Sequence, residues 1–568
     1  MEKREVILAR LHAAAQRLPQ YESEYQNLNQ RDYDHVYPLV QGYILDRFLL
    51  TEEMCASEKL LDLADVSLRY MLALKRMGID PGQISRSCSG ASSVISKKVL
   101  LMKAVQEIFH VSMTPAEFAE ISTVSELAAF ICSQPQENTV QKLVVQEKYT
   151  EEVAHSFDVG RIRQDFPALS QTIHGHPLVY LDNAATTKTA PEVVQAMLPY
   201  FSEYYGNPSS IYDFAGKSKE AITKGREQIA EVLGAKKEEI YFTAGGSESD
   251  NWALKATFEA YKAKGNHIIT TKIEHHAILH TCEYLEKRGA KITYVDVDEN
   301  GIVKLDELEK AITPETILIS VMFANNEIGS IQPIKEIGRI AKEHGVLFHT
   351  DAVQAFCQVP INVDECNIDM LSSSGHKING PKGIGFLYIR KGVKIRSFVH
   401  GGAQERKRRA GTENVPGIVG YGAAAARANA SMKERTDKEI AIRDHLIHRI
   451  ETEIPYVKVN GDRIKRLPNN VNVSFQFVEG ESLLLMLDNY GICASSGSAC
   501  TSGSLDPSHV LLAIGLPHEI AHGSLRMTLS EETTMEDVDF VVDRLKEIVA
   551  HLRSMSPLYE DFMKKQNK

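Results

Sequence analysis

An aspartate and a lysine stand at the ends of two apolar runs, in an arrangement that suits cofactor chemistry. Asp351 ends the run VLFHTD, and Lys377 follows the run DMLSSS, 26 positions further along the chain. Each run has the length and composition of a buried β-strand. A lysine at one strand end can form a Schiff base with pyridoxal phosphate, while a carboxylate at a neighbouring one keeps the pyridine nitrogen protonated. The alternatives are a helix cap for Asp351 and a solvated surface lysine for Lys377; the polar, glycine-rich context SSSGHKINGPKGIG disfavours the second.

Other residues offer the remaining contacts that such a cofactor needs. Gly246 and Ser247, in the turn TAGGSESDN, can present backbone N–H groups and a hydroxyl to a phosphate at a helix N-terminus, although many turns carry Gly-Gly without a ligand. His275 can stack on a ring and handle protons near neutral pH. Asn326 can hydrogen-bond a ring hydroxyl or a carboxylate, and Arg526 can bind a carboxylate in a bidentate manner. A structural histidine and a structural ion pair are the alternatives for His275 and Arg526.

One cysteine lies in a segment that cannot build a core element. Cys500 is surrounded by serine, glycine and threonine in ASSGSACTSGSLDPSH. Buried structural cysteines behave as small apolar residues, so this context favours an exposed thiol used in chemistry. The eight cysteines form no CxxC pair and no His/Cys cluster at zinc spacing, and no resident metal site is predicted.

The patterns around these residues predict an α/β fold with an additional helical region. Apolar β-rich runs alternate with amphipathic stretches from about residue 157, which predicts right-handed crossovers, a mainly parallel sheet and ligands beyond the carboxyl ends of strands. Residues 1–132 read as nearly all helical, and 133–156 as a polar linker. The expected strands lie within 239–246, 267–276, 291–298, 316–327 and 346–354, and expected helices within 250–265, 278–289 and 333–345.

Composition and charge narrow the function classes. The chain has 568 residues, 43% hydrophobic residues and a formal net charge of -11. The negative charge argues against stable nucleic-acid binding and against binding to anionic membranes. The first twenty residues lack the apolar core of a secretory signal, and no apolar run is long enough to span a bilayer. We therefore expect a cytoplasmic protein with reduced thiols and no direct membrane association.

Together, a set of motifs resembles the class I cysteine desulfurases of the NifS/IscS type. The motifs run in the correct order between about residues 158 and 552: YLDNAATT, YGNPSS, EHHAIL, NNEIG, DAVQ, SGHKINGPKGIG, AGTENVP and SSGSACTSGSLDPSHVL. The resemblance implies an aspartate-aminotransferase-like fold (fold type I), in a homodimer. It further implies a large cofactor domain over 157–430, which includes the initial segment, and a smaller C-terminal α/β domain over 431–568.

The resemblance also implies a role for each candidate residue. Lys377 would bind pyridoxal phosphate covalently, Asp351 would face its pyridinium nitrogen, Gln354 would contact its ring hydroxyl and His275 would stack on the ring. Asn326 and Arg526 would position the cofactor and the substrate carboxylate. The phosphate would be held by Gly246, Ser247, Ser374, His376 and, from the second subunit of the dimer, Thr412. Gly-Ser replaces the commoner Ala-Thr at the phosphate turn, which keeps the N–H and hydroxyl donors.

The implied reaction removes sulfur from L-cysteine, giving L-alanine and a persulfide on Cys500. The long form of the cysteine segment implies direct donation to sulfur-acceptor proteins, such as an iron–sulfur scaffold, with Cys500 able to contact a cluster iron during transfer. A selenocysteine lyase or an aminotransferase on the same scaffold is the rival enzyme. A non-catalytic scaffold is the rival of another class.

The N-terminal region is similar to the last two helices of an acyl or peptidyl carrier protein. The similarity rests on MKAVQEIFHVSMTPAEFAEISTVSELAAFI. Ser92, Ser93 and Ser96 lie near the position of the modified serine, but the Asp-Ser-Leu motif is missing. We expect either a degenerate carrier-like fold used for contact or an unrelated helical bundle.

Overall fold

The computed structural model describes most of the chain outside the segment that follows the N-terminal helices. The described residues are 4–28, 30–77, 79, 94–111, 113–114, 117, 120–134, 172–496 and 507–566. Ser92, Ser93 and Cys500 lie outside them, as does the predicted linker except for its first two residues; the backbone of Ser96 is described but its side chain is not. Within the described part, no helix is both long enough and apolar enough to cross a membrane.

A seven-stranded sheet forms the centre of the large domain. Its order is β4-β10-β9-β8-β7-β5-β6, and β9, β8, β7, β5 and β6 pair in parallel while β10 is antiparallel to both of its neighbours. The strands are β4 (Ile240–Thr243), β5 (His267–Thr271), β6 (Lys291–Val295), β7 (Thr316–Ser320), β8 (Leu347–Asp351), β9 (Met370–Ser374) and β10 (Gly385–Ile389). Each predicted strand is present within its expected range, and the predicted mainly parallel sheet is confirmed.

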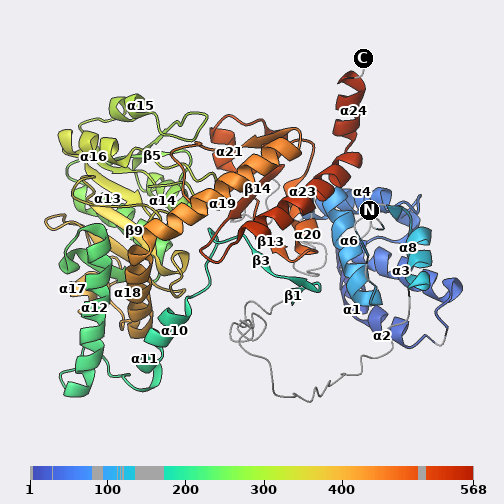
Figure 1. Ribbon diagram of the computed structural model, residues 1–568, viewed down its shortest axis with the longest axis horizontal. Coiled ribbons are helices and arrows are strands. Elements are labelled where there is room, and N and C mark those ends of the chain that lie inside the picture. The colour runs from blue at the N-terminus through green and yellow to red at the C-terminus, as the bar shows by residue number, and fades with distance from the viewer. Residues whose placement is uncertain are drawn as a thin grey trace, which may run out of the picture.

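Helices cover the sheet and bury its apolar side chains (Figure 1). The helices of this part are α10 (Pro191–Met197), α11 (Pro199–Ser202), α12 (Gly216–Leu233), α13 (Gly246–Tyr261), α14 (His276–Glu286), α15 (Leu305–Lys310), α16 (Ile334–Glu343), α17 (Gln404–Lys407) and α18 (Val415–Ala430). All five residues of β5, β7, β9 and β10 are buried. Strands covered on both faces read as continuous apolar runs, and their carboxyl ends are the part left for chemistry.

The C-terminal part of the chain builds a second, smaller sheet. Its strands lie in the order β11-β12-β14, and neighbouring strands are antiparallel. The two residues of β3, which precede the large sheet in the chain, pair in parallel with β13. The elements are β3 (Val179–Tyr180), α19 (Met432–Glu453), β11 (Val457–Val459), β12 (Asn470–Phe475), α20 (Gly480–Asp488), β13 (Ile492–Cys493), α21 (His509–Ala513), α22 (His518–Ala521), β14 (Ser524–Thr528), α23 (Met535–Ser554) and α24 (Pro557–Gln566). A short hairpin of β1 (Thr172–Ile173) and β2 (His176–Pro177) precedes β3.

The described residues before the hairpin form helices, as predicted, and pack against the small sheet's helices (Figure 1). They are α1 (Arg4–Arg17), α2 (Gln20–Gln26), α3 (Tyr33–Phe48), α4 (Leu60–Arg76), α6 (Val94–Phe109) and α8 (Val124–Ser133). Thr123 and Glu126 form a capping box that fixes the start of α8. One hydrophobic core runs from these helices into α19, α20 and α23, and an ion pair between Lys103 and Asp488 joins α6 to α20.

Candidate active site

The carboxyl ends of β8 and β9 bring the predicted aspartate and lysine to one edge of the sheet. Asp351 is the last residue of β8 and pairs with Ser372 of β9, while Lys377 ends a short turn, Gly375–Lys377, directly after β9. Lys377 Nζ donates hydrogen bonds to the carbonyl oxygens of Ala184 and, at 2.8 Å, Ala185. Gln354 Nε2 donates to the same Ala184 oxygen at 3.0 Å, so the Lys377 amine and the Gln354 amide converge on one carbonyl group.

The carboxyl group of Asp351 is buried at this edge. Its Oδ1 accepts a hydrogen bond of 2.9 Å from the Val353 N–H group. Burial raises the pKa of Asp351 to about 6, although the Val353 hydrogen bond and the charge of Lys377 favour its ionised form. A cationic ring nitrogen placed against this carboxyl group would further favour the carboxylate.

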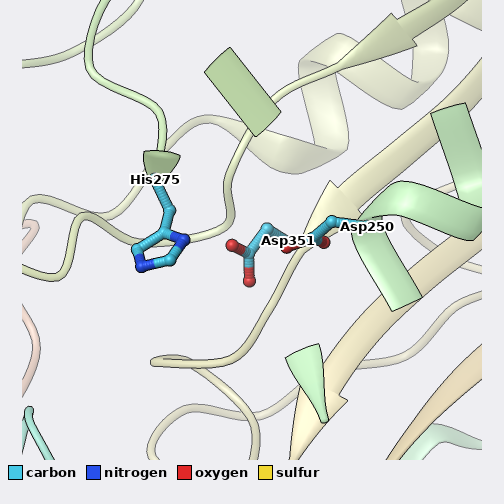
Figure 2. Close-up of side chains that lie close together, drawn as sticks. All are labelled: Asp250, His275 and Asp351. Atoms are coloured by element: carbon cyan, nitrogen blue, oxygen red, sulfur yellow. The ribbon is translucent and has the colours of Figure 1, made fainter. Parts of the chain in front are cut away.

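His275 faces Asp351 and a second carboxyl group, that of Asp250 (Figure 2). One nitrogen of His275 and one oxygen of each aspartate all lie within 4.8 Å of one another. His275 is the N-cap of α14, where its Nδ1 accepts a hydrogen bond of 3.1 Å from the Ala277 N–H group. Burial, followed by the charge of Lys377, lowers the pKa of His275 to about 4. The ring is therefore neutral at pH 7, and Nε2 is the nitrogen that carries its hydrogen.

The glycine turn before α13 packs closely on Val353 and lies beside the Ser374 hydroxyl. A side-chain carbon added to Gly246 would lie 2.6 Å from Val353 Cγ2, and one added to Gly245 would lie 3.7 Å from the hydroxyl oxygen of Ser374. Gly246 begins α13, and the exposed Ser247 follows it in the first turn. The N–H groups and the dipole at a helix start favour a negative charge, so this turn and the Ser374 hydroxyl fit a phosphate.

His376 directly precedes Lys377 in the chain. Its Nδ1 lies 3.2 Å from Thr186 Oγ1, and its carbonyl oxygen accepts a hydrogen bond of 2.9 Å from the Thr187 N–H group. Burial and the charges of Lys377 and Lys382 lower the pKa of His376 to about 4, so it is a neutral hydrogen-bonding group at pH 7.

Arg526 and Asn326 meet on the side of the small sheet. Arg526 is buried in β14; it donates a hydrogen bond of 3.1 Å to the Asn326 carbonyl oxygen and forms an ion pair of 2.9 Å with Asp182. Its Nε is buried and has no hydrogen-bond partner among the described residues. Arg526 thus holds a structural ion pair and retains guanidinium N–H groups that no described residue accepts.

Two predicted residues are not placed against these groups. Thr412 lies in the exposed part of the segment between α17 and α18, and its predicted role concerns the second subunit of a dimer. Cys500 lies outside the described residues, but both ends of its segment are anchored. The Ser495 N–H group donates to the Arg526 carbonyl oxygen at 3.0 Å, and His509 Nε2 lies 3.0 Å from the carbonyl oxygen of Glu274.

Sequence reasoning missed three carboxyl groups around the site: Asp182, Asp250 and Glu274. Asp250 had a signal, because Ala253 and Leu254, three and four positions further along the same helix, are apolar. Such spacing places a charged residue on the buried face of the helix. Asp182 and Glu274 lie in irregular segments, where no periodicity indicates the direction of a side chain.

Comparisons with known proteins identify relatives for the part of the chain that holds this site. Residues 179–541 match the model of the aminotransferase class-V family. A cysteine desulfurase IscS of Clostridium botulinum (strain Hall) is 59% identical over 388 residues, which is 68% of this chain and 98% of that protein. A cysteine desulfurase IscS of Methanosarcina thermophila is 60% identical over 380 residues, or 67% of this chain and 94% of that protein. A solved NifS-like protein superimposes with a TM-score of 0.62 at 40% identity, covering 66% of this chain and 99% of the other.

The sheet and the groups at its edge define the fold-type I class of pyridoxal-phosphate enzymes. The match to the family model and the extent of these relatives make the assignment more specific. The chain belongs to the aminotransferase class-V family, in its cysteine desulfurase branch.

The residues present fit the cofactor of that class. A buried carboxyl group, a lysine and a neutral imidazole lie at one edge of the sheet, and the glycine turn that begins α13 packs closely on Val353 beside the Ser374 side chain. Asp351 would supply the partner for a ring nitrogen, Lys377 the amine for covalent attachment, and the first turn of α13 the donors for a phosphate.

Proposed function

We propose that this protein is a pyridoxal-phosphate-dependent cysteine desulfurase that transfers the sulfur of L-cysteine to Cys500. The observation that carries the proposal is the meeting of Asp351 and Lys377 at adjoining strand ends, opposite His275. The relatives named cysteine desulfurase, and a solved SspA in complex with cysteine at 38% identity and a TM-score of 0.56, support this substrate.

When bound, pyridoxal phosphate supplies an electron sink that labilises bonds to the substrate's α- and β-carbons. Lys377 binds the cofactor and places its Nζ where it can move protons at the substrate. Asp351 holds the charge that keeps the ring nitrogen protonated, and Gln354 donates a hydrogen bond at the ring hydroxyl. His275 packs on the ring as a neutral imidazole.

The anion of the cofactor would be held by N–H groups and hydroxyls rather than by a cluster of cations. Gly246 and Ser247 contribute the start of α13, Ser374 a hydroxyl, and His376 a ring nitrogen. Thr412 of a second subunit completes this set.

Arg526 and Asn326 orient the amino-acid substrate. The Arg526 Nε, which has no partner among the described residues, is the donor available to the carboxylate of L-cysteine. Because Asp182 and the Asn326 carbonyl fix the remainder of the guanidinium, the substrate meets a preorganised group.

Cys500 accepts the sulfur. The bond between the β-carbon and the sulfur of L-cysteine breaks and an S–S bond forms at Cys500 Sγ, so that L-alanine and a Cys500 persulfide together contain all atoms of L-cysteine and the thiol. The segment that carries Cys500 begins beside Arg526 and ends beside Glu274, which keeps both ends next to the site. Glycine and serine lower the cost of moving the intervening residues between the site and an acceptor.

A homodimer is part of the proposal. Large apolar side chains are exposed around α11 and the following turn, and the most exposed are Phe201, Tyr205, Ile211 and Tyr212, at 62%, 70%, 99% and 54%. A patch of this kind indicates a protein interface, and a second copy of the chain both covers it and delivers Thr412. Sulfur acceptors such as an iron–sulfur scaffold, in the cytoplasm, then receive the persulfide sulfur, and Cys500 contacts a cluster iron during that transfer.

The experiment is to measure L-alanine formed from L-cysteine by the protein loaded with pyridoxal phosphate, in the presence of a thiol reductant. We expect Cys500→Ser to lower the rate at least about a hundredfold, as for loss of a nucleophile, while the absorbance of the bound cofactor stays unchanged. Cys366→Ser, at a half-buried thiol outside the site, serves as the control and retains the rate. Full alanine formation by Cys500→Ser would refute the assignment.

A further inference from the structure

Asp250 is a buried carboxyl group that the proposed chemistry does not use. It lies in the second turn of α13 and is 1% exposed. Its Oδ1 has no hydrogen-bond partner among the described residues. This oxygen needs an explanation, because an unpaired buried carboxylate is costly.

The groups that face Asp250 come from three further elements. Asp351 and His349 approach from β8, Ser372 from β9, and Glu274 and His275 from the segment that leads into α14. Of these, the carboxyl group of Asp351 and a nitrogen of His275 lie within 4.8 Å of an Asp250 oxygen (Figure 2). Lys377 acts on Asp351, whose ionised form it favours.

His349 does not provide the positive charge that an ionised Asp250 would need. Its Nδ1 and Nε2 lie 2.9 Å from the hydroxyls of Ser320 and Ser372, and Nε2 is 3.8 Å from Asp250. Burial lowers the pKa of His349 to about 3, so the ring is neutral. The hydroxyl–imidazole–hydroxyl chain therefore ends at Asp250 without bringing a charge to it.

Two ionised carboxylates this close together would repel each other strongly. Burial, followed by the negative charge of Asp351, raises the pKa of Asp250 well above its usual value, although a hydrogen bond from Ser372 favours its ionised form. Asp351 has the lysine and is the group that a ring nitrogen contacts. The proton therefore resides on Asp250.

We propose that Asp250 is a positioning residue for Asp351: it keeps its proton, so that Asp351 alone presents a negative charge to the cofactor ring. The neutral carboxyl group of Asp250 packs beside the Asp351 side chain. Its hydrogen bond with Ser372 also links it to the hydroxyl–imidazole–hydroxyl chain around His349. The inference rests on the proposed function for its consequence at the cofactor, whereas the location of the proton is a property of the polypeptide itself.

The location of the proton is tested first, by infrared difference spectra of the full-length wild type minus each variant, recorded both without and with pyridoxal phosphate. We expect a band of a protonated carboxyl group at neutral pH that Asp250→Asn removes. Asp369→Asn is the matched control, because Asp369 is a carboxyl group at the opposite end of the same strands and bonds the Phe348 N–H group. A spectrum in which Asp250→Asn removes no such band, or removes only a carboxylate band, overturns the inference.

The consequence at the cofactor is tested by the pH dependence of the absorbance of bound pyridoxal phosphate. The side chain in Asp250→Asn is neutral and polar. We therefore expect the proton affinity of the bound cofactor, read from the midpoint of its absorbance titration, to stay within roughly twofold of the wild-type value. Asp250→Val removes the polar group, and we expect about tenfold weaker cofactor binding, which the asparagine variant restores. A tenfold shift of the midpoint in Asp250→Asn, or unchanged binding and titration in Asp250→Val, contradicts the role. If the wild type itself never binds the cofactor, the proposed function fails instead, and the infrared result still decides where the proton lies.

Discussion

The large sheet and the N-terminal helices both bury polar side chains, but they arrange them differently. At the ends of β8 and β9, carboxyl, imidazole and amine groups from separate elements converge, and Asp250, His275 and Asp351 lie within 4.8 Å of one another. Among the N-terminal helices, Lys97 of α6 is buried but bonds the Ser67 hydroxyl of α4 and lies 5.1 Å from the centre of the Phe48 ring. The convergence of unlike titratable groups is typical of a functional site. A buried lysine that bonds a hydroxyl and packs on a ring of neighbouring helices is instead typical of structural packing.

The contact between the N-terminal helices and the small sheet also has the character of structural packing rather than of a chemical site. Here α6 packs on α20 within one hydrophobic core, and the polar tie is the ion pair of Lys103 with Asp488. Since α20 leads through β13 to the segment that carries Cys500, the helices support the segment without contributing a described residue to the site. Substitutions in the two regions should therefore separate into chemical and structural effects.

The largest effect is expected at Lys377. Lys377→Ala removes both the covalent attachment point and the proton-moving amine, and we expect desulfurase activity to fall by about 10²–10⁴-fold or more. Lys382→Ala, at an exposed lysine of the same segment, should leave activity within about twofold, as is usual for surface substitutions. The measurement is L-alanine formation together with the absorbance of bound cofactor. Equal activities of the two variants would contradict the proposed role of Lys377 in the chemistry.

The next effect concerns stability and lies in the other region. Leu101 is fully buried in the core shared by the N-terminal helices and the small sheet. Leu101→Ala should lower the free energy of unfolding by about 2–5 kcal/mol through lost burial and a cavity. The cofactor absorbance should stay unchanged where the protein is folded.

Leu72, on α4, is 39% exposed and provides the control. Leu72→Ala should change the free energy of unfolding by about 0.5 kcal/mol or less. Urea unfolding of both variants measures the two changes in the free energy of unfolding. If Leu101→Ala altered the cofactor absorbance of the folded protein, the N-terminal helices would belong to the chemistry after all.

A dependence of stability on pH is expected from Glu274, a buried carboxyl group next to the site. Burial raises the pKa of Glu274 from 4.5 to about 8, although hydrogen bonds from Met322 and Thr271 favour ionisation. The folded state then binds more protons than the unfolded state between these values, so stability falls as pH rises from 4.5 towards 8, by at most about 1.4 kcal/mol per pH unit.

Glu274→Gln removes this titration while keeping an oxygen to accept the hydrogen bonds. We expect its stability to decline less steeply than that of the wild type over this pH range. Urea unfolding at several pH values provides the measurement. Parallel curves for the two proteins would show that Glu274 does not titrate in the folded state as described.

The smallest effect is expected for the ion pair between the regions. Lys103→Met keeps the apolar stem of a side chain that is 17% exposed but removes the charge that faces Asp488. We expect a loss of about 1 kcal/mol or less, because one partner is partly exposed. A double-mutant cycle with Asp488→Asn isolates the pair, and a coupling energy above about 3 kcal/mol would contradict a merely supporting role.

Much of the large domain could be predicted from sequence because its strands are short apolar runs separated by amphipathic helices. Asp351 and Lys377 were predicted because Asp351 ends one such run and Lys377 lies three positions after another, and strand ends meet at one edge of a parallel sheet. The pairing of Arg526 with Asp182 was not predictable from periodicity, since Asp182 lies in an irregular segment far away in the chain. The packing of α6 on α20 was also missed, because an amphipathic pattern shows which face is buried but not which partner covers it.

The central claim is that a cofactor bound to Lys377 releases the sulfur of L-cysteine to Cys500. Its most direct test is the mass of the peptide that contains Cys500, taken from the full-length protein after brief exposure to pyridoxal phosphate and L-cysteine without reductant. We predict that this peptide gains the mass of one sulfur atom and that Lys377→Ala abolishes the gain. A wild-type peptide of unchanged mass, in a protein that nevertheless forms L-alanine from L-cysteine, would contradict the account.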